Sequence, residues 1–360
     1  VTLADDPDGD GNTGAGERGV RLQDHSTNDT ITGGASDDTV DIATSTASDD
    51  TVELGGGDDT FVVNGGGKIN AADTLTGGSG TDTFDANGSA LDLTATSVTD
   101  ASITGIDRIV QDNDGANQIT IGDEFVSASD NSQVAISLND QDNNNPNTTV
   151  DIDAGVSQGN TVLLDGVDVG ALDGTDDFNL TAASRVTLAD DPDGDGSSGA
   201  GETGVELSDS TGDDTITGGA SDDRVDLTGN GGDDTVDLAG GDDTFNIADG
   251  SQIDSNDSLT GGAGTDTFDI GTNNLNAESG EDLGDASLSG IDKILVDNTS
   301  VQTVKVDDDF VSQSDNATVT IEHTGDGSAV TVDAGVSEDN TVVLSNEADS
   351  FTLSGSGSDT

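Results

Sequence analysis

Two acidic loops in this sequence have the residue types and the spacing of a calcium-binding site. Each has acidic side chains at positions one, three, five and twelve of a twelve-residue frame, and a glycine at position six. Three carboxylates spaced two residues apart can converge on one ion, the glycine permits a sharp turn, and the final glutamate closes the shell with both oxygens. The candidate ligands, which include the position-seven residue through its carbonyl, are Asp6, Asp8, Asp10, Asn12 and Glu17 in the first loop and Asp191, Asp193, Asp195, Ser197 and Glu202 in the second.

These loops resemble the EF-hand calcium loop, with two departures. The residues VTLA that precede each loop have the pattern of a strand rather than a helix. Position eight is Thr13 or Ser198, where the EF-hand has an apolar residue. The resemblance therefore implies the calcium ligands of the loop and not a helix–loop–helix unit. The alternative interpretation is a flexible acidic turn.

A second group of aspartates belongs to a nine-residue repeat. Gly77–Asp85 reads GGSGTDTFD, Gly261–Asp269 reads GGAGTDTFD, and looser copies precede both. Each copy has an aspartate at position six and an apolar residue two places later, and its glycines supply turn conformations that are closed to other residues. The position-six aspartates are Asp29, Asp38, Asp50, Asp59 and Asp82, then Asp214, Asp223, Asp234, Asp243 and Asp266.

These repeats predict the short strands of a calcium-binding parallel β-roll. Successive side chains of a strand point to opposite faces, so the apolar residue should point inward and the Thr or Arg before it outward. Two repeats should form one turn of about 18 residues, with like side chains stacked in columns. The expected inward residues are Ile31, Val40, Val52, Phe61 and Phe84, then Ile216, Val225, Val236, Phe245 and Phe268.

Such columns would bring aspartates of neighbouring turns close together. Two carboxylates ~4 Å apart at an effective dielectric constant near 20 repel each other by ~4 kcal/mol. A bound cation would convert these carboxylates into ligands, and its binding free energy would then contribute to folding. We therefore expect calcium, in several copies, to be required for the fold.

The nine-residue repeats resemble the RTX family, the glycine- and aspartate-rich repeats of exported bacterial proteins. The resemblance covers about 60 residues in each half of the chain. It departs from the pattern at Ser36 and Ser221, which replace a glycine, and in the longer steps from Asp38 to Asp50 and from Asp59 to Asp82. The resemblance implies a β-roll folded by calcium outside the cell, after type I secretion. The segments TGIDRIV and QITI are similar to segments of bacterial surface-layer proteins and large adhesins.

The chain consists of two tandem copies. VTLADDPDGDG begins at Val1 and again at Val186, and the shared segments continue to the end of the chain. The first copy, 1–185, comprises the calcium loop (1–27), the β-roll (28–88) and a β-rich segment (89–185). The second copy, 186–360, comprises 186–212, 213–272 and 273–360 in the same order. The last segment of each copy alternates apolar and polar residues over short runs, which predicts β-structure but does not distinguish a sheet from a solenoid. The predicted fold class is all-β, with little or no helix.

The composition restricts the partners of the chain. It has 75 acidic and 8 basic residues, a net charge of −67, so nucleic acid and anionic membrane should be repelled. No run of about 18 apolar residues occurs that could be inserted in a membrane. Cysteine is absent, which excludes disulfides and Cys-based zinc or catalytic sites. The two histidines, His25 and His323, are expected at the surface.

The sequence therefore predicts a calcium-stabilised structural repeat module of a large extracellular surface protein, such as a surface layer, filament or adhesin stalk. Neighbouring copies of the same unit are the expected partners, and no enzyme activity is expected. One alternative is a calcium-binding accessory region of a secreted RTX-type hydrolase or toxin. Another is a protein of a saline or marine organism, since about six calcium ions would neutralise only ~12 charges.

Overall fold

The computed structural model of the chain describes the following residues: 1–7, 12–23, 27–42, 48–63, 69, 72–86, 91–93, 102–111, 118–121, 123–130, 133–140, 149–152, 161–168, 178–180, 185–188, 190, 198–227, 232–247, 253, 256–271, 275–277, 287–296, 302–314, 317–324, 330–335, 341–346 and 351–354. They fall into two compact units, Val1–Asn179 and Leu180–Thr360. The copy and segment boundaries predicted from the repeats stay predictions.

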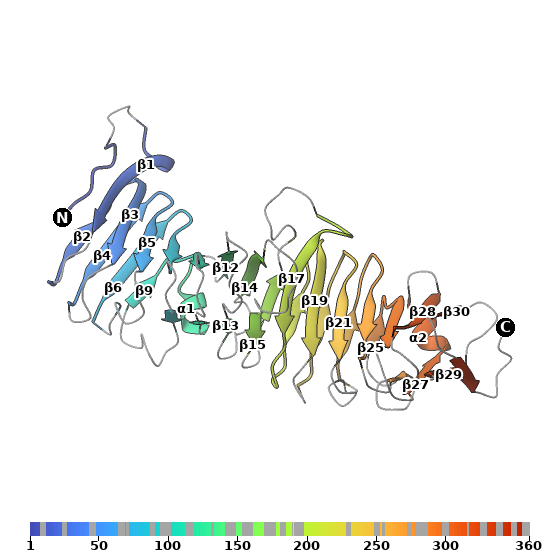
Figure 1. Ribbon diagram of the computed structural model, residues 1–360. Helices are drawn as coiled ribbons and strands as arrows, with labels where there is room; N and C mark the ends of the chain where they lie inside the picture. The colour runs from blue at the N-terminus through green and yellow to red at the C-terminus, as the bar shows by residue number, and fades with distance from the viewer. Residues whose placement is uncertain are drawn as a thin grey trace. The chain divides into compact units, whose positions relative to one another are not determined.

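Unit 1 is a solenoid of short parallel strands, in which each strand pairs with the strand one turn away (Figure 1). Its longest sheet has, in order, β1 (Gly14–Gln23), β3 (Ser36–Ile42), β5 (Thr60–Val63), β7 (Thr83–Asp85), β10 (Arg108–Gln111), β12 (Gln133–Asp140) and β14 (Thr161–Asp168). A second sheet has β2 (Thr30–Thr32), β4 (Thr51–Gly56), β6 (Thr74–Ser79) and β9 (Ser102–Thr104), and a third has β8 (Leu91–Leu93), β11 (Gln118–Ile121) and β13 (Thr149–Ile152).

Unit 2 has the same construction. One sheet has β16 (Arg185–Leu188), β18 (Thr215–Thr217), β20 (Thr235–Asp237), β22 (Ser258–Thr260) and β25 (Ser287–Ser289). The second has β17 (Thr203–Ser208), β19 (Asp222–Leu227), β21 (Thr244–Ile247), β23 (Thr267–Asp269), β26 (Lys293–Val296), β28 (Thr318–His323) and β30 (Thr341–Asn346). The third has β24 (Leu275–Ala277), β27 (Gln302–Asp307), β29 (Val330–Gly335) and β31 (Phe351–Ser354), and β15 (Phe178–Leu180) lies where the two units divide.

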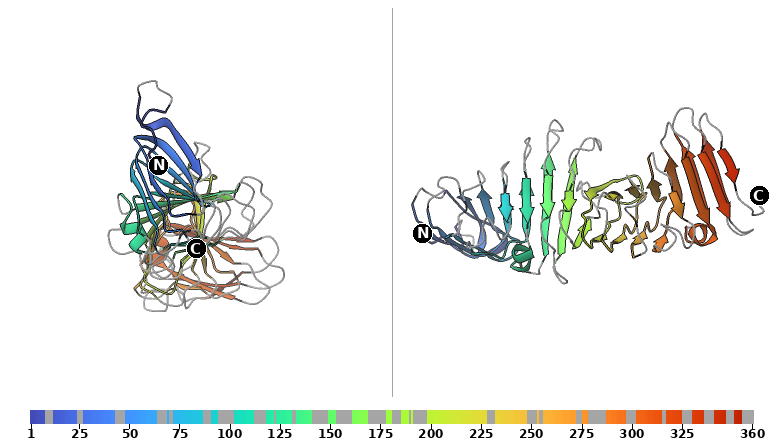
Figure 2. Two further views of the ribbon diagram at one scale, coloured as in Figure 1. Left: turned by 90° about the vertical axis from the view of Figure 1, so that its left-hand side faces the viewer. Right: turned by 90° about the horizontal axis from the view of Figure 1, so that it is seen from below.

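The all-β prediction is confirmed, and the solenoid extends beyond the nine-residue repeats. In unit 1, β10 pairs in parallel with β7 on one side and with β12 on the other, and β12 pairs in parallel with β14. The long strands β12 and β14 lie side by side in the right-hand view of Figure 2 (green). The β-rich segment that sequence alone left undecided is therefore a continuation of the solenoid. Helix is confined, among the described residues, to two single turns, α1 (Asp123–Ser127) and α2 (Asp308–Ser312), and neither could cross a membrane.

The core is one stack of inward side chains in each unit. All ten apolar residues predicted to point inward are at most 2% exposed, and the Thr or Arg residue before each is on the outer face. Phe61 and Phe84 contact edge to face at 5.4 Å between ring centroids, and Phe84 stacks on Phe125 of α1 at 6.1 Å. Unit 2 repeats this stack with Phe245, Phe268 and Phe310. The alternation of the sequence therefore fixes the inside of the solenoid, as strand geometry requires.

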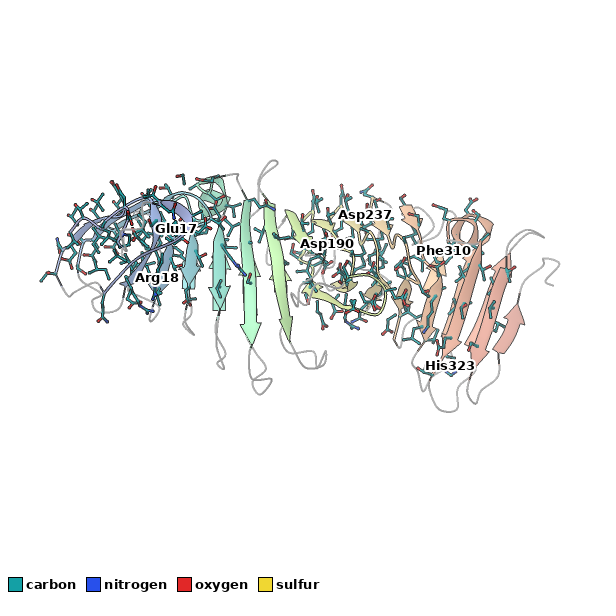
Figure 3. The ribbon with its side chains drawn as sticks, turned by 90° about the horizontal axis from the view of Figure 1, so that it is seen from above. Glu17, Arg18, Asp190, Asp237, Phe310 and His323 are labelled. Carbon is teal, nitrogen blue, oxygen red and sulfur yellow. The ribbon has the colours of Figure 1, made fainter. Side chains whose placement is uncertain are left out.

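Two expectations are corrected by the structure. The register Thr39↔Thr60↔Thr83 gives turns of 21 and 23 residues, not 18, because the connections between repeats are lengthened. His323 is 2% exposed at the end of β28 rather than at the surface (Figure 3). It occupies an inward position of the strand, which follows from its place in the alternation of β28. His25 lies outside the described residues.

Candidate calcium sites

The position-six aspartates of unit 1 form a ladder along the long sheet. The backbone N–H of Asp38 donates to Asp59 Oδ1 at 2.7 Å, and that of Asp59 donates to Asp82 Oδ1 at 2.9 Å. The N–H of Val20 donates to Asp38 Oδ1 at 2.7 Å at the start of the ladder. The three carboxylates are at most 1% exposed. Each turn is therefore held by the acidic side chain of the turn that follows it.

A second ladder in unit 1 precedes the strands β2, β4 and β6. Asp29 N–H donates to Asp50 Oδ1 and Asp50 N–H donates to Asp73 Oδ1, both at 2.8 Å. Asp73 was not among the predicted site residues, because Ala71 and Ala72 stand where the repeat has other residues. It is nine residues before Asp82 and two before the buried Leu75, so the phase of the repeat could have identified it.

Unit 2 reproduces both ladders. The N–H of Val205 donates to Asp223 Oδ1 at 2.7 Å, that of Asp223 donates to Asp243 Oδ1 at 2.7 Å, and that of Asp243 donates to Asp266 Oδ1 at 3.0 Å. Asp214 and Asp234 donate to Asp234 and Asp257, both at 2.8 Å. Asp257 is the counterpart of Asp73 and was missed for the same reason. The structure thus places all ten predicted position-six aspartates in ladders and adds two aspartates to each unit. Besides Asp73 and Asp257, these are Asp107 and Asp292, which accept the N–H groups of Asp82 and Asp266 at 3.1 and 3.4 Å.

The glycines of the repeat allow successive turns to approach this closely. Gly80 has φ of +136°, and a β-carbon there would clash with the carbonyl oxygen of Gly57 in the preceding turn. Gly264 has φ of +146° and would clash with Gly241 in the same way. Neither the conformation nor the contact is open to a residue with a side chain. At these two turns, the close approach of successive backbones therefore depends on glycine at position four of the repeat.

The second oxygens of the ladder carboxylates divide into two classes. In the first turns they have protein donors: Gly34 N–H donates to Asp38 Oδ2 at 3.0 Å, and Gly219 N–H donates to Asp223 Oδ2 at 2.9 Å. In the next turns, Oδ2 of Asp59, Asp82 and Asp243 is buried without a hydrogen-bond partner among the described residues. A buried carboxylate oxygen without a donor is costly, so these oxygens require either a proton or a cation.

The electrostatics of the ladders agree with this requirement. Burial, together with repulsion from neighbouring carboxylates, raises the pKa of Asp59, Asp82, Asp223 and Asp234 to about 7 and that of Asp243 to about 8. The backbone donors oppose the shift without cancelling it. Without a cation, the ladder therefore holds protons that it would release on binding a metal ion.

The oxygen atoms that line the ladders are ligands that suit a hard cation. A β-carbon on Gly19 would overlap the carbonyl oxygen of Asp37 and Oδ1 of Asp38, and Gly204 is in the same position beside Asp222 and Asp223. Glycine therefore allows the backbone at these positions to pack closely against carbonyl and carboxylate oxygens of the next turn. Calcium prefers such mixed oxygen ligands in irregular geometry. Among the described residues no three acidic or histidine side chains form a metal cluster by themselves, so backbone carbonyls would have to complete each shell.

An outer ladder, which the sequence did not reveal, runs beside the ladder of Asp38, Asp59 and Asp82 and its counterpart in unit 2, which we call the inner ladders. Asp58 N–H donates to Asp37 Oδ1 at 2.7 Å, and Thr81 N–H donates to Asp58 Oδ1 at 2.9 Å. In unit 2, Asp222 and Asp242 accept N–H groups of the turn that follows in the same way. In this ladder the acceptor belongs to the earlier turn, opposite to the inner ladder. The two ladders together attach each turn to both of its neighbours.

The acidic loops at the start of each copy are only partly described. Asp6 is half-buried, Asn12 is exposed, and Glu17 lies in β1 beside Arg18 (Figure 3). Asp8 and Asp10 lie outside the described residues, as do Asp191, Asp193, Asp195 and Ser197. Glu202 is described and half-buried. The loop sites therefore stay a prediction.

Comparison with known proteins identifies the repeats. The family of the RTX calcium-binding nonapeptide repeat matches residues 21–42, 40–67, 70–90, 206–227, 226–245 and 254–274. No curated protein and no solved structure matches the chain. The matched segments contain all ten predicted position-six aspartates. The predicted resemblance to the RTX family is therefore confirmed for these segments. The residues after 90 and after 274 in the two units, which continue the solenoid, lie outside the matches.

Proposed function

We propose, from the RTX calcium-binding nonapeptide repeats that both units contain, that this chain is a calcium-stabilised structural module of a large extracellular surface protein. Calcium would bind in the ladders and hold successive turns of the solenoid together. The module would then serve as a stiff repeating element of a surface layer, filament or adhesin stalk. We propose no catalytic role for it.

One observation carries the calcium part of the proposal. Asp59 and Asp82 are fully buried, and their Oδ2 atoms have no donor among the described residues, although both Oδ1 atoms accept a backbone N–H. At neutral pH, a cation would compensate both the missing donor and the repulsion between stacked carboxylates. Because the ladder forms only in the folded chain, the binding free energy would be gained only on folding.

The structural part of the proposal is supported by the repetition of the chain. Each unit is a solenoid whose turns contact mainly their neighbours, and such units can be repeated in series without a change of fold. RTX proteins are typically secreted, and millimolar calcium outside the cell would keep such sites filled. Neighbouring copies of the same unit are the proposed partners. A catalytic domain elsewhere in the same polypeptide would instead favour the accessory region of a secreted hydrolase or toxin.

The test is a measurement of folding against calcium. The chain is freed of metal by dialysis against chelator and followed by far-UV circular dichroism as calcium is added. We expect β-structure in millimolar calcium and largely coil without it. Magnesium at the same concentration serves as the control, because it demands regular octahedral geometry and keeps its waters. A spectrum that does not change on thorough removal of calcium would contradict the proposal.

A further inference from the structure

We propose that the two ends of this chain bind each other in separate molecules, so that folded chains join head to tail. The C-terminal turn, formed by β30 and β31, receives the N-terminal turn of a second copy of the chain, formed by residues 1–3 and β1. The inference rests on the proposed function, in which neighbouring copies of the same unit are the partners. It identifies the two surfaces through which such copies bind.

The N-terminal turn exposes apolar side chains that are buried at the same positions of the second repeat. Leu22 pairs with the buried Val40, so it occupies an inward position of β1. Leu22 is nevertheless only half-buried, and Val1 is 70% exposed. Their counterparts in the second repeat, Val186 and Leu207, are both 0% exposed. The first turn of the chain therefore has an inner face that is not fully covered.

The C-terminal turn has the same property. The segments NTVLL and NTVVL make β14 and β30 equivalent strands of the two repeats. In β30, Leu344 pairs with the fully buried Ile321 of β28, yet Leu344 and Val342 are only half-buried. The equivalent residues of β14, Val162 and Leu164, are 0% exposed. The last turn is thus also left incompletely covered.

The residue types are the same at the buried and the exposed positions, so the difference comes from their place in the chain. Among the described residues, the two large hydrophobic side chains that are exposed are Val1 and Val343, one in each end turn. In a solenoid, each turn is covered by the turn that stacks on it. Apolar side chains that are exposed only at the two ends therefore fit a surface that another turn of the same kind covers.

The strand order within each unit determines which segments meet. β28 pairs in parallel with β30 and β29 with β31, so each strand pairs with the second strand after it. At the other end, Thr2 bridges to Thr32 in β2, and β1 pairs with β3. Continued from one chain to the next, this order places residues 1–3 beside β30 and β1 beside β31. The open backbone edges of the last turn then gain parallel partners.

Charge favours the pairing of these two unlike ends. β1 contains Arg18 and Arg21, two of the 8 basic residues of the chain. The second repeat has Thr203 and Glu206 at these positions. The side chain of Arg21 is 68% exposed, although it forms an ion pair with Asp41. The sequence after residue 305 contains acidic residues but no Lys or Arg, so the arginines of β1 reduce the repulsion between two strongly acidic chains at this contact.

The stacked carboxylates of the inner ladders do not reach either end. At the first turn, β1 contributes the N–H of Val20, which donates to Asp38 of the next turn. In unit 2 the inner ladder runs to Asp292, before β26, and β28 and β30 follow in the sheet. Among the described residues, the ladder thus places no row of negative charge on the end turns that would oppose their contact.

The test is sedimentation velocity of the full chain in saturating calcium over a range of protein concentrations. We expect a series of oligomers that grows with concentration, because unlike ends leave one free end of each kind after every addition. Leu22→Asp places a charge in the N-terminal surface and Leu344→Asp in the C-terminal surface. Each variant alone should sediment as a monomer.

An equimolar mixture of these two variants tests the orientation. Leu22→Asp retains an intact C-terminal turn and Leu344→Asp an intact N-terminal turn, so the mixture should form a one-to-one dimer and no larger species. Binding between like ends would instead allow one of the variants to dimerise alone, which would overturn the proposal. A parent chain that folds in calcium and stays monomeric at every concentration would overturn it too. A fold that does not depend on calcium would contradict the proposed function alone, because the mixture still reports on the ends.

Two further variants separate association from folding. Thr235→Asp adds the same charge at an exposed position of β20 and should associate like the parent. Arg21→Glu introduces the residue that the second repeat has at this position, so the fold should be retained, while association should weaken about fivefold. Circular dichroism in calcium verifies the fold of every variant. Association of a folded Arg21→Glu chain equal to that of the parent would contradict the contact between β1 and the acidic end.

Discussion

Asp59 N–H donates to Asp82 Oδ1 at 2.9 Å, while Oδ2 of the same carboxylate is buried without a partner among the described residues. One oxygen thus satisfies the backbone of the preceding turn, and the other remains for a cation. On this division of roles within one side chain, an asparagine at position six could accept the N–H but would not supply the second carboxylate oxygen. It also separates carboxylates that should bind calcium from those that should not.

We expect Asp59→Asn to bind at least one calcium ion fewer than the parent, and Asp38→Asn to bind the same number. Both aspartates accept an N–H through Oδ1, but Oδ2 of Asp38 also accepts the N–H of Gly34. The count of bound ions by calorimetry decides between them. Equal losses in the two variants would show that the free oxygen does not mark the calcium ligand.

The calcium-free chain should be more stable in weak acid than at pH 8. The pKa is raised by burial from 3.8 to about 7 in Asp59 and Asp82 and to about 8 in Asp243, so between pH 4 and 8 the folded state binds more protons than the unfolded state. The contribution of these groups is therefore fully present below about pH 4 and is lost as the pH rises to about 8.

Urea denaturation of the metal-free chain at pH 5.5 and pH 8 measures this dependence. Both pH values lie above the pI of about 4.1. Replacing Asp59 and Asp243 by Asn should reduce the difference in unfolding free energy between the two pH values. The control is Glu53→Gln, which removes one negative charge at an exposed position of β4 and should leave this difference unchanged. Greater stability at pH 8 without calcium would contradict the raised pKa values.

Glu17→Gln and Glu202→Gln should each remove about one bound ion, independently of the ladders. In the predicted loop, the glutamate at position twelve closes the calcium shell with both oxygens, and glutamine supplies only one. Calorimetric titration of the single and double variants gives the count. A stoichiometry equal to that of the parent would show that these loops are acidic turns only.

Gly264→Ala should destabilise unit 2 by at least about 2 kcal/mol in saturating calcium, because it combines an unfavourable φ with a backbone clash. Gly240→Ala is the matched control in the same unit. Its φ is not in the left-handed region, and its nearest atom would be 3.7 Å from the added carbon. Urea midpoints of the two variants measure the difference. Equal unfolding free energies of the two variants would show that the turns can move apart to relieve the clash at position 264 without loss of stability.

Phe268→Ala should destabilise unit 2 by about 3–5 kcal/mol, the usual cost of removing a buried aromatic ring. The ring is fully buried and contacts Phe245 at 5.4 Å and Phe310 at 6.4 Å between centroids. Val343→Ala, at a position 41% exposed, should change the unfolding free energy by less than about 1 kcal/mol. Similar effects of both substitutions would contradict a core built on the aromatic stack.

The inside of the solenoid could be predicted from sequence because position seven and position eight of each repeat differ in type. Val40 and Phe61 are apolar and buried, whereas the Thr before each is polar and partly exposed, and successive residues of a strand point to opposite faces. The length of a turn could not be predicted, because the connections after Ile42 and Val63 interrupt the nine-residue phase. Asp73 was missed for a similar reason, since its neighbours depart from the repeat.

The course of the chain after the repeats could not be predicted from local pattern. Strands such as β12 alternate in the same way in a parallel solenoid and in an antiparallel sandwich, and only the pairing with β10 and β14 distinguishes them. The burial of His323 is a similar case, since its strand places it inward against the preference of its side chain. The outer ladder of Asp37 and Asp58 was hidden by the abundance of acid in the sequence.

The two ladders together leave carboxylates at both open edges of an incomplete solenoid. In the inner ladder every N–H group belongs to the earlier turn and every carboxylate to the later one, from Val20 to Asp107. In the outer ladder the order is reversed, since Asp37 and Asp58 accept N–H groups of the turn that follows. A solenoid that lacks its first turns therefore ends in inner-ladder carboxylates, and one that lacks its last turns ends in outer-ladder carboxylates. Charge at an open edge opposes the pairing of edges of separate chains. A partly assembled solenoid would thus be protected against aggregation at whichever edge is still growing.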